Sequence, residues 1–533
     1  MLEWRGQLRA GFQLVSRWTR SATAQRVLVL LLSVFSVSLA YAWYPGQDGF
    51  FDSAFYLDGA RHLAAGDGYV SAVTDADRSD YAPVTRWAPG FPAFTALLMR
   101  SFDVPALQAA SVVLGLAYVG LVVASVVLAS AVFGPNSRAL SLLCALLVAC
   151  NSGVMATLDS LLSDLPFGAL AVVNTALALK LARTAQWHWG VVLLFAALLA
   201  GMFFVRYAGA LYIPGVLAAL ALSMRLHRRS LRQIAWNLGR VVVLLSAFVG
   251  VWIARNLQVA SLPFGSRIAS SEHWHEHARR ALHGFFAWWF SLQELARSVG
   301  AERWLLGLTL ATAVACVLLL LQRSVHMWEG LLFTLLPALS YAGLMIAAAS
   351  RVKLDSIEHV RFWVPVWPLT FVAVSCIAAH AAARWHRASS AVVIASLLIF
   401  LWTEVTWLRD ALPAANQQRG LLTDTWQAAA ATLPEPAECR LYATDVRPLM
   451  LHRSLGPASE IPGDVSAFNL AASKHERVCL AVFSKRLRVS TTAERRRQEQ
   501  NKVVSELQRE GRLERVSASA GVAIYALHRD GSR

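Results

Sequence analysis

The sequence predicts a polytopic α-helical membrane protein that carries a small α/β domain at its C-terminal end. Apolar residues make up 56% of the 533 positions and charged residues only 15%, whereas soluble domains carry about 25% charged residues. Long stretches lack charge altogether, among them Val27–Trp43 and Val104–Phe133. Uncharged, mostly apolar runs of about 18 or more residues are typical of membrane-spanning helices. The polar residues after the last such run indicate a separate folded domain.

About eleven spans follow from the lengths of the apolar runs and the breaks between them. The first is interpreted as a retained signal anchor, because its apolar run exceeds the roughly 7–15 residues of a cleaved signal. The predicted spans are 26–44, 105–133, 139–157, 164–182, 188–205, 207–224, 236–254, 304–322, 328–349, 362–383 and 388–408.

The basic residues predict how these spans are oriented. The net charge is +16, and much of it lies in the short gaps between spans, so topology explains it and nucleic-acid binding is not predicted. Loops rich in Lys and Arg stay in the cytoplasm. The leader before the first span is basic, and so is the loop over 225–232. The N-terminus is therefore predicted to be cytoplasmic, and an odd number of spans places the tail outside.

Three large segments are predicted on the outer face: a first loop over 45–103, a second over 255–303, and the tail. The chain is accordingly divided into a membrane domain, 1–408, and an extracytoplasmic C-terminal domain, 409–533. In this tail "ECRLYATD" and "RVCLAVFS" read as short strands, and "TTAERRRQEQNKVVSELQREG" reads as a helix that ends at a glycine.

The six cysteines form no CxxC pair and no metal-ligand spacing with histidine. Four of them lie in apolar spans, where cysteine behaves as a small hydrophobic residue. Cys439 and Cys479 lie in the polar tail. A disulfide between these two is one of two open alternatives, since it requires an oxidising compartment.

Ionisable residues gather at the predicted outer ends of the spans. Positive-inside bias depletes arginine there, yet Arg206, Arg255 and Arg361 all map to this face. Each one alone is explained by a side chain that snorkels to the interface. Three at one depth favour an anion site, because arginine forks bind phosphate oxygens bidentately. A transporter, the alternative, should place its ionisable residues near the middle of the bilayer.

Several ordered segments resemble the GT-C superfamily of glycosyltransferases. They are "DSAFYLDGARHLAAGDGY" from Asp52, "WAPGFPAFTALL", "LLSDLPFGAL", "VRYAGALYIP", "ARNLQVASLPFGSR" and "EHVRFWVPVWPL". The likeness extends to protein O-mannosyltransferases and to lipid A aminoarabinose transferases. It implies an enzyme of the bacterial inner membrane that transfers a sugar from a polyprenyl-phosphate donor to an extracytoplasmic glycan, lipid or protein.

The resemblance implies that Asp52 is the catalytic base, with helix N-capping as the alternative role of this residue. Ser53 stands where the family carries a second acid, and Asp48 is the candidate to replace it. Tyr56 shares a helix face with Asp52 and either orients substrate or packs. Asp164 matches a family acid and is given a supporting or acceptor-binding role. Asp58 is expected to form a solvated ion pair along its helix, with Arg61 or His62.

The donor phosphate is assigned to Arg206, Arg255 and Arg361, assisted by His359. No metal is assigned. The cluster "EHWHEH" at 272–277 contains two histidines at a possible ligand spacing, but an amphipathic helix at the membrane interface explains it more simply. A divalent metal remains an open, disfavoured alternative.

The implied reaction is an inverting single displacement, with the spans holding the prenyl chain. Three other functions stay open. An O-antigen ligase or polymerase should carry its key residues in a late outer loop, whereas here the acids lie in the first. A lipid-linked-sugar transporter or flippase should lose lipid movement, and not glycan transfer, when Asp52 is replaced. A family member that has lost activity and serves as a partner subunit would account for Ser53.

Overall fold

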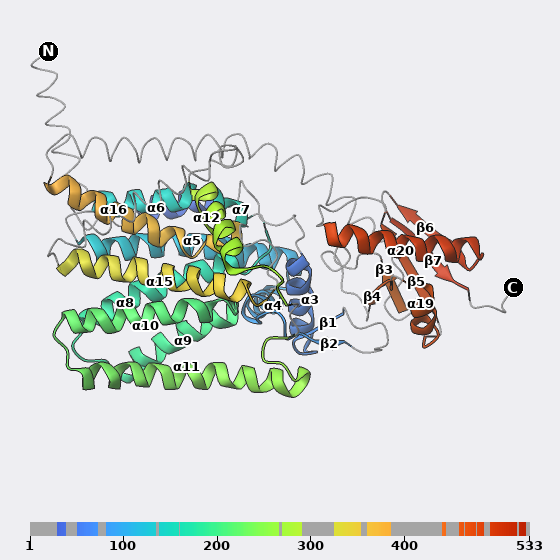
Figure 1. The fold of residues 1–533 in the computed structure, drawn as a ribbon, viewed down its shortest axis with the longest axis horizontal. Coiled ribbons are helices and arrows are strands. Elements are labelled where there is room, and N and C mark those ends of the chain that lie inside the picture. The colour runs from blue at the N-terminus through green and yellow to red at the C-terminus, as the bar shows by residue number, and fades with distance from the viewer. Residues whose placement is uncertain are drawn as a thin grey trace, which may run out of the picture. The chain divides into compact units, whose positions relative to one another are not determined.

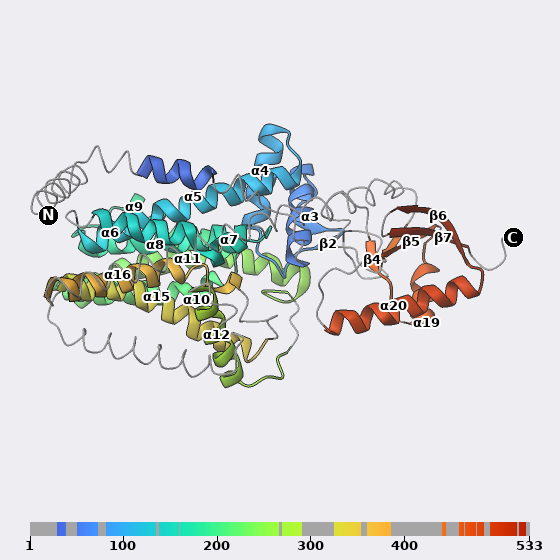
Figure 2. The same ribbon diagram turned by 90° about the horizontal axis from the view of Figure 1, so that it is seen from above.

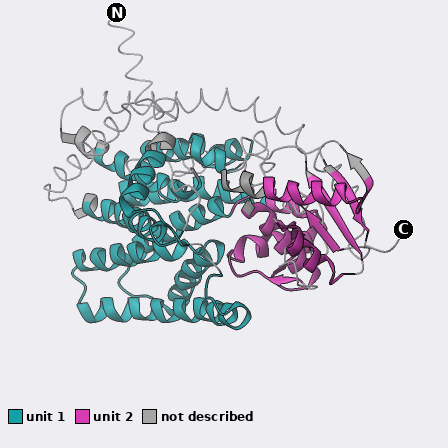
Figure 3. Cartoon of the chain, turned by 45° about the vertical axis from the view of Figure 1, so that its right-hand side comes forward, with its two compact units in different colours: residues 1–45, 112–159, 163–413 teal, residues 46–111, 160–162, 414–533 magenta. Residues whose placement is uncertain are grey.

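The structure is a computed structural model, and it describes most of the chain. The described residues are 29–38, 51–72, 81–134, 138–158, 160–265, 269–289, 325–352, 360–384, 440–443, 458–462, 464–475, 477–483, 491–519 and 522–528. Two compact units are formed by segments that alternate along the sequence (Figure 3). Unit 1 contains 1–45, 112–159 and 163–413, and unit 2 contains 46–111, 160–162 and 414–533.

Unit 1 is a bundle of long apolar helices, most of which run side by side (Figure 1). A short helix, α12, follows the bundle helix α11 and is rich in histidine and tryptophan. The helices are α5 (Ala106–Phe133), α6 (Arg138–Cys150), α7 (Ser152–Leu158), α8 (Asp164–Arg183), α9 (Trp189–Val205), α10 (Gly209–Leu226), α11 (Leu231–Ala260), α12 (Trp274–Trp289), α15 (Val325–Ala349), the 3₁₀ turn η2 (Val360–Trp363) and α16 (Trp367–Arg384).

The described helices confirm a protein that crosses the membrane several times. Five of them are long and apolar enough to span a bilayer: α5, α8, α10, α11 and α15. A sixth is formed if the bent pair α6 and α7 is one span. Helix α9 and the apolar part of α16 are shorter and match two further predicted spans. The predicted spans over 304–322 and 388–408 lie outside the described residues, so the number eleven stays a prediction.

The span predicted over 139–157 is broken, with a bend of 51° between α6 and α7. The break falls at Asn151, whose side-chain Oδ1 accepts the backbone N–H of Val154 at 3.0 Å and so caps the second helix. Gly153 follows, and the Trp367 ring fills the space that a Cβ there would need. A capping asparagine and a glycine under an indole therefore redirect the chain inside an apolar run.

Helices α10 and α15 approach closely because small residues lie between them. A Cβ on Gly215 would come within 2.6 Å of the Pro337 Cα. The Ser340 hydroxyl donates to the Leu211 carbonyl at 3.0 Å. Close backbone approach at small residues, supplemented by interhelical hydrogen bonds, is how helices associate in lipid.

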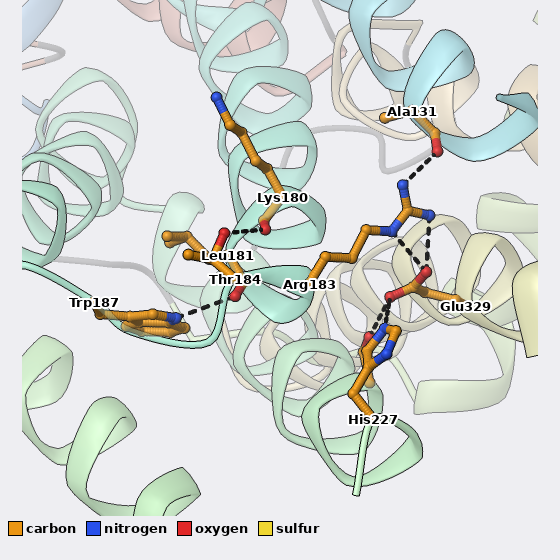
Figure 4. A network of polar contacts seen from close by, with 9 residues as sticks. Ala131, Lys180, Leu181, Arg183, Thr184, Trp187, His227 and Glu329 are labelled. Carbon is orange, nitrogen blue, oxygen red and sulfur yellow. Dashed lines mark hydrogen bonds and ion pairs between the residues drawn. The ribbon is translucent and has the colours of Figure 1, made fainter. Parts of the chain in front are cut away.

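A single buried carboxylate joins three helix ends of this bundle (Figure 4). Glu329, near the start of α15, accepts from Arg183 Nη2 at 2.7 Å and from His227 Nε2 at 2.9 Å. The Ser223 hydroxyl donates to the same carboxylate at 2.6 Å. Arg183 also donates to the Ala131 carbonyl of α5 at 2.9 Å. A buried charge is tolerated when it is paired and hydrogen-bonded in this way.

Unit 2 begins with two helices and a short hairpin. Helix α3 (Phe51–Ala65) is followed by strands β1 (Val70–Ser71) and β2 (Ala82–Pro83), then by α4 (Gly90–Phe102). Strands β1 and β2 pair antiparallel. Helix α3 ends at Gly66, which has a φ of +94°. The Gly66 N–H donates to the carbonyls of His62 and Leu63, and the Asp67 N–H donates to the carbonyl of His62. This is a Schellman termination.

The tail of unit 2 forms a five-stranded sheet with strand order β4-β3-β5-β7-β6. Helices α19 and α20 cover the same face of this sheet (Figure 2). Their apolar side chains, among them Phe468 and Leu507, pack on Tyr442 and Leu480. The strands and helices are β3 (Arg440–Ala443), β4 (Ala458–Glu460), α19 (Val465–Ala472), β5 (Val478–Phe483), α20 (Thr491–Arg509), β6 (Leu513–Ser519) and β7 (Val522–Leu527).

The prediction of a small C-terminal α/β domain is therefore confirmed. "ECRLYATD" contains β3, "RVCLAVFS" contains β5, and the predicted helix is α20, which is followed by Gly511 at φ +67°. Cys479, in β5, is disulfide-bonded. Cys439 lies outside the described residues. In the described part of the chain the free cysteines are Cys144, Cys150 and Cys376.

Candidate functional site

Asp52 lies in the first turn of α3, where the helix dipole stabilises a negative charge. The helix begins one residue before it, so Asp52 is a first-turn residue of α3. Its Oδ1 accepts the indole N–H of Trp87 at 2.8 Å. A donor from a neutral ring fixes the carboxylate without neutralising it.

Trp87 is held by contacts on several sides. Its ring stacks on Phe55 with centroids 4.0 Å apart, and the Arg86 guanidinium lies 5.3 Å from its centroid. The Tyr69 hydroxyl donates to the Trp87 carbonyl at 3.3 Å. Gly59 allows this arrangement, because a Cβ there would lie 2.7 Å from the Tyr69 ring. The orientation of the indole thus depends on α3 and on the hairpin together.

Tyr56 is 4% exposed and packs edge-on against Phe91 of α4, with ring centroids 5.5 Å apart. This contact is the packing role that was one of its two expected roles. It fixes α3 on α4, the helix that follows Trp87 in the chain.

Asp58 corrects one expectation. It is fully buried instead of solvated, and its Oδ2 accepts the Ser71 hydroxyl at 2.9 Å and the Ala72 N–H at 2.7 Å. His62 lies 3.8 Å from its other oxygen and also contacts Asp67 at 2.9 Å. Burial raises the pKa of the Asp58 carboxyl, although these hydrogen bonds and the charges of His62 and Arg61 act in the opposite direction. The helix-face pattern revealed the partner His62 but could not reveal the hairpin that covers both residues.

In unit 1, Asp164 and Arg206 form an ion pair of 2.7 Å. Asp164 opens α8 and Arg206 follows the last residue of α9. Their side chains are 1% and 12% exposed, so the pair is largely removed from solvent. Gly209 makes the tight turn into α10 possible, because a Cβ there would meet the Met202 carbonyl oxygen at 2.7 Å.

Arg361, in η2, lies against the same aromatic ring as Arg206. The guanidinium groups of Arg206 and Arg361 lie 5.3 and 5.0 Å from the centroid of the Phe362 ring. Tyr341, 1% exposed, interacts electrostatically with Asp164, Arg206 and Arg361. Two guanidinium groups therefore lie against one aromatic ring, and donors of this kind suit an anion such as a phosphate.

Arg255 lies in a neighbouring group on α11. Its guanidinium is 4.9 Å from the Trp252 centroid and donates to Asn256 at 3.0 Å. The Trp252 indole N–H donates to the Tyr207 hydroxyl at 2.8 Å, and Tyr207 follows Arg206 directly in the chain. Arg206 and Arg361 thus share one ring, while Arg255 belongs to the adjoining aromatic group.

The comparisons with known proteins bear on the fold. No protein-family model matches the chain, and no curated protein matches it. Among solved structures, ArnT from Cupriavidus metallidurans bound to undecaprenyl phosphate superposes with a TM-score of 0.59 at 12% identity, covering 95% of this chain and 98% of that one. Its apo structure gives 0.58 at the same identity and coverage. The archaeal oligosaccharyltransferase AglB from Archaeoglobus fulgidus, in complex with an inhibitory peptide and a dolichol-phosphate, gives 0.51 at 8% identity, over 85% and 69% of the two chains.

The chain has the GT-C fold. Similarity over nearly the full length of ArnT includes the helical bundle and the C-terminal residues together. The fold class predicted from the ordered motifs is therefore confirmed.

Two predicted site residues, Asp48 and His359, lie outside the described residues. Among the residues that are described, no group of three or more His, Cys, Asp and Glu side chains could hold a metal ion. The cluster "EHWHEH" leads into α12, as expected for a helix. There His277 is buried and lies 3.6 Å from Glu272.

Sequence reasoning missed Trp87, Phe362 and Tyr341. Trp87 and Phe362 each stand inside a quoted motif, next to the residues that drew attention. An aromatic side chain in an apolar chain gives no local sign that its ring lies against a charged group. Tyr341 lies in the middle of an apolar span, where a lone tyrosine is usually a packing residue.

Proposed function

We propose that the chain is a membrane glycosyltransferase that moves a sugar from a polyprenyl-phosphate donor to an extracytoplasmic acceptor. One observation carries this proposal. Arg206 and Arg361 lie over one phenylalanine ring, and Arg206 is paired with Asp164, in a fold shared with ArnT, whose solved structure is bound to undecaprenyl phosphate.

The arginines are assigned to the donor phosphate. A guanidinium presents a planar fork of N–H donors that matches phosphate oxygens, and burial strengthens its interaction with a charge. Asp164 holds Arg206 in place and offsets part of the local positive charge. Arg255, from the neighbouring aromatic group, and His359 complete the predicted set for the phosphate.

Asp52 is assigned to the acceptor. In the proposed step its carboxylate takes the proton from an acceptor hydroxyl or amine, and the freed electron pair forms a bond to the anomeric carbon of the sugar. The bond from that carbon to the phosphate oxygen breaks, and the electron pair leaves with the phosphate. One displacement of this kind inverts the anomeric configuration. Asp48 and Tyr56 are assigned supporting roles, and no metal is assigned to the step.

The proposed location is the bacterial inner membrane, with the N-terminus in the cytoplasm and the C-terminal domain outside. The disulfide of Cys479 supports this orientation, because disulfides persist in oxidising compartments. The apolar helices of unit 1 are assigned to the prenyl chain.

The test is transfer by the purified chain from a panel of polyprenyl-phosphate sugars, comparing wild type with Asp52→Asn. Loss of a general base lowers rates by about 10²–10⁴-fold. Asp103→Asn is the matched control, since Asp103 is exposed and holds a left-handed conformation, φ +51°, that asparagine also adopts. Equal transfer by wild type and Asp52→Asn would remove the assignment of the base. Lipid movement without transfer would remove the proposed enzyme.

A further inference from the structure

The edge of the C-terminal sheet is hydrogen-bonded to Ala72, the residue that directly follows β1 in the hairpin of unit 2. Strand β4 is an edge strand, and its Ala458 N–H donates to the Ala72 carbonyl at 2.7 Å. Ile461 of the same segment donates to Ala443 of β3. Since N–H groups alternate along a strand, the Ala458 N–H faces away from the sheet. An edge of this kind is a template for further backbone pairing.

Ala72 is bound on its other side by the helix that carries Asp52. Its N–H donates to Asp58 Oδ2 at 2.7 Å, and the neighbouring Ser71 hydroxyl donates to the same oxygen. One residue thus connects β4 through its carbonyl and α3 through its N–H. Both Ala72 and Asp58 are fully buried, so neither bond competes freely with water.

The connection ends at the proposed catalytic carboxylate. Asp58 lies six positions after Asp52 on one continuous helix, a rise of about 9 Å at 1.5 Å per residue. Tyr69, which directly precedes β1, donates its hydroxyl to the Trp87 carbonyl, and Trp87 donates to Asp52. The helix and the indole that orient the carboxylate are therefore fixed by the same short segment.

Strand β4, which carries Ala458, is also held to β3 by a side-chain hydrogen bond. Arg440 of β3 donates to the Ser459 hydroxyl at 2.9 Å in a buried position. Ser459 follows Ala458 directly, so the donor that reaches Ala72 lies on a strand held by both backbone and side-chain bonds.

We propose that the C-terminal domain positions the catalytic helix, with Asp58 as the positioning residue that links β4, through Ala72, to α3. The inference rests on the proposed function, because it assigns to the tail domain a part in holding Asp52. It gives this domain a role in the rate of transfer that does not require the domain to touch substrate.

The test uses the full chain with Ala458→Pro, which removes the N–H given to Ala72. Proline is tolerated in an edge strand where its missing N–H faces away from the sheet. Arg515→Pro on the opposite edge strand, β6, is the matched control. The Arg512 carbonyl accepts from His528 and Arg515 pairs with Tyr525, so alternation along the antiparallel ladder turns the Arg515 N–H away from β7.

We expect Ala458→Pro to lower kcat about three- to tenfold, the usual effect of one hydrogen bond. We expect the donor KM to stay unchanged and amide hydrogen exchange in α3 to increase, while Arg515→Pro behaves as wild type. Asp58→Ala should reproduce the loss of kcat, and Asp58→Asn, which keeps an acceptor for Ala72, should restore part of it.

The proposal is overturned if Ala458→Pro leaves both kcat and α3 exchange at wild-type values, or if Arg515→Pro lowers kcat equally. Exchange is measured without substrate, so it separates this inference from the proposed function. If wild type transfers no sugar, the proposed function fails, and the link between the sheet and α3 still stands or falls on the exchange of Ala458→Pro against Arg515→Pro.

Discussion

The indole N–H of Trp87 donates to Asp52 Oδ1 at 2.8 Å, although the two residues lie 35 positions apart in the sequence. The bond joins the start of α3 to the segment that leads into α4. It orients the proposed base from a distant part of the sequence.

Trp87→Phe should lower kcat about 10- to 100-fold, because a hydrogen bond to a charged group contributes about 1.5–3 kcal/mol. The phenyl ring keeps the stacking on Phe55 and loses only the donor. Hydrogen bonding to the ionised form favours ionisation, so the acid limb of the pH–rate profile should move to higher pH. Kinetics of sugar transfer across pH measure both effects.

Trp187→Phe is the control for that substitution. Its indole N–H donates to the Leu181 carbonyl at 3.1 Å, away from any residue assigned to the reaction, so the pH profile should not move. A Trp87→Phe enzyme with an unshifted acid limb would mean that the indole does not act on the base.

Helix α3 shows which features the sequence can predict and which it cannot. The end of α3 at Gly66 was predictable, because a glycine after an apolar-periodic segment gives a local signal. The burial of Asp58 was not, because its partners Ser71 and Ala72 come from a hairpin that the helix periodicity does not describe. The arginines drew attention because positive-inside bias should deplete them at the predicted outer ends of the spans, but their shared contact with Phe362 depended on the geometry of η2.

The Asp164–Arg206 pair predicts two substitutions with opposite effects on an anion. Arg206→Gln should weaken binding of undecaprenyl phosphate about tenfold or more, through loss of a charged donor. Asp164→Asn should tighten it at low ionic strength, because Arg206 loses its neutralising partner. Both variants should unfold at a lower temperature, since a broken buried pair costs about 3–5 kcal/mol. Equal weakening by both would contradict the assignment of Arg206 to the phosphate.

Asp58 predicts a pH dependence of stability. Burial raises the pKa of its carboxyl in the folded state, so its contribution to stability is fully present below the unfolded pKa of about 3.9. That contribution is lost as the pH rises through the folded pKa. Thermal unfolding of wild type relative to Asp58→Asn should therefore show a difference in Tm that falls from pH 4 to pH 8. A rising difference would mean that the hydrogen bonds to Asp58 outweigh its burial.

The disulfide of Cys479 predicts the compartment of the C-terminal domain. Alkylation of denatured protein from membranes should leave Cys479 unmodified until a reductant is added, because a thiol held in a disulfide cannot react. Cys144, buried and free, reports that denaturation exposed the thiols. Peptide mass spectrometry reads both sites, and alkylation of Cys479 without reduction would remove the support for an extracytoplasmic tail.

Glu329 predicts a loss of stability that is separate from activity. Its carboxylate binds Arg183, His227 and Ser223 at the far end of α8, where Arg183 lies 19 positions after Asp164, about 28 Å along the helix. Glu329→Gln leaves the Arg183 charge without its counter-ion, so the Tm should fall by an amount that reflects about 3–5 kcal/mol. The kcat per folded molecule should stay at the wild-type value. Glu506→Gln, on the exposed side of α20, should change neither. A lowered kcat at unchanged Tm would instead mean that this network acts on the reaction through the bundle.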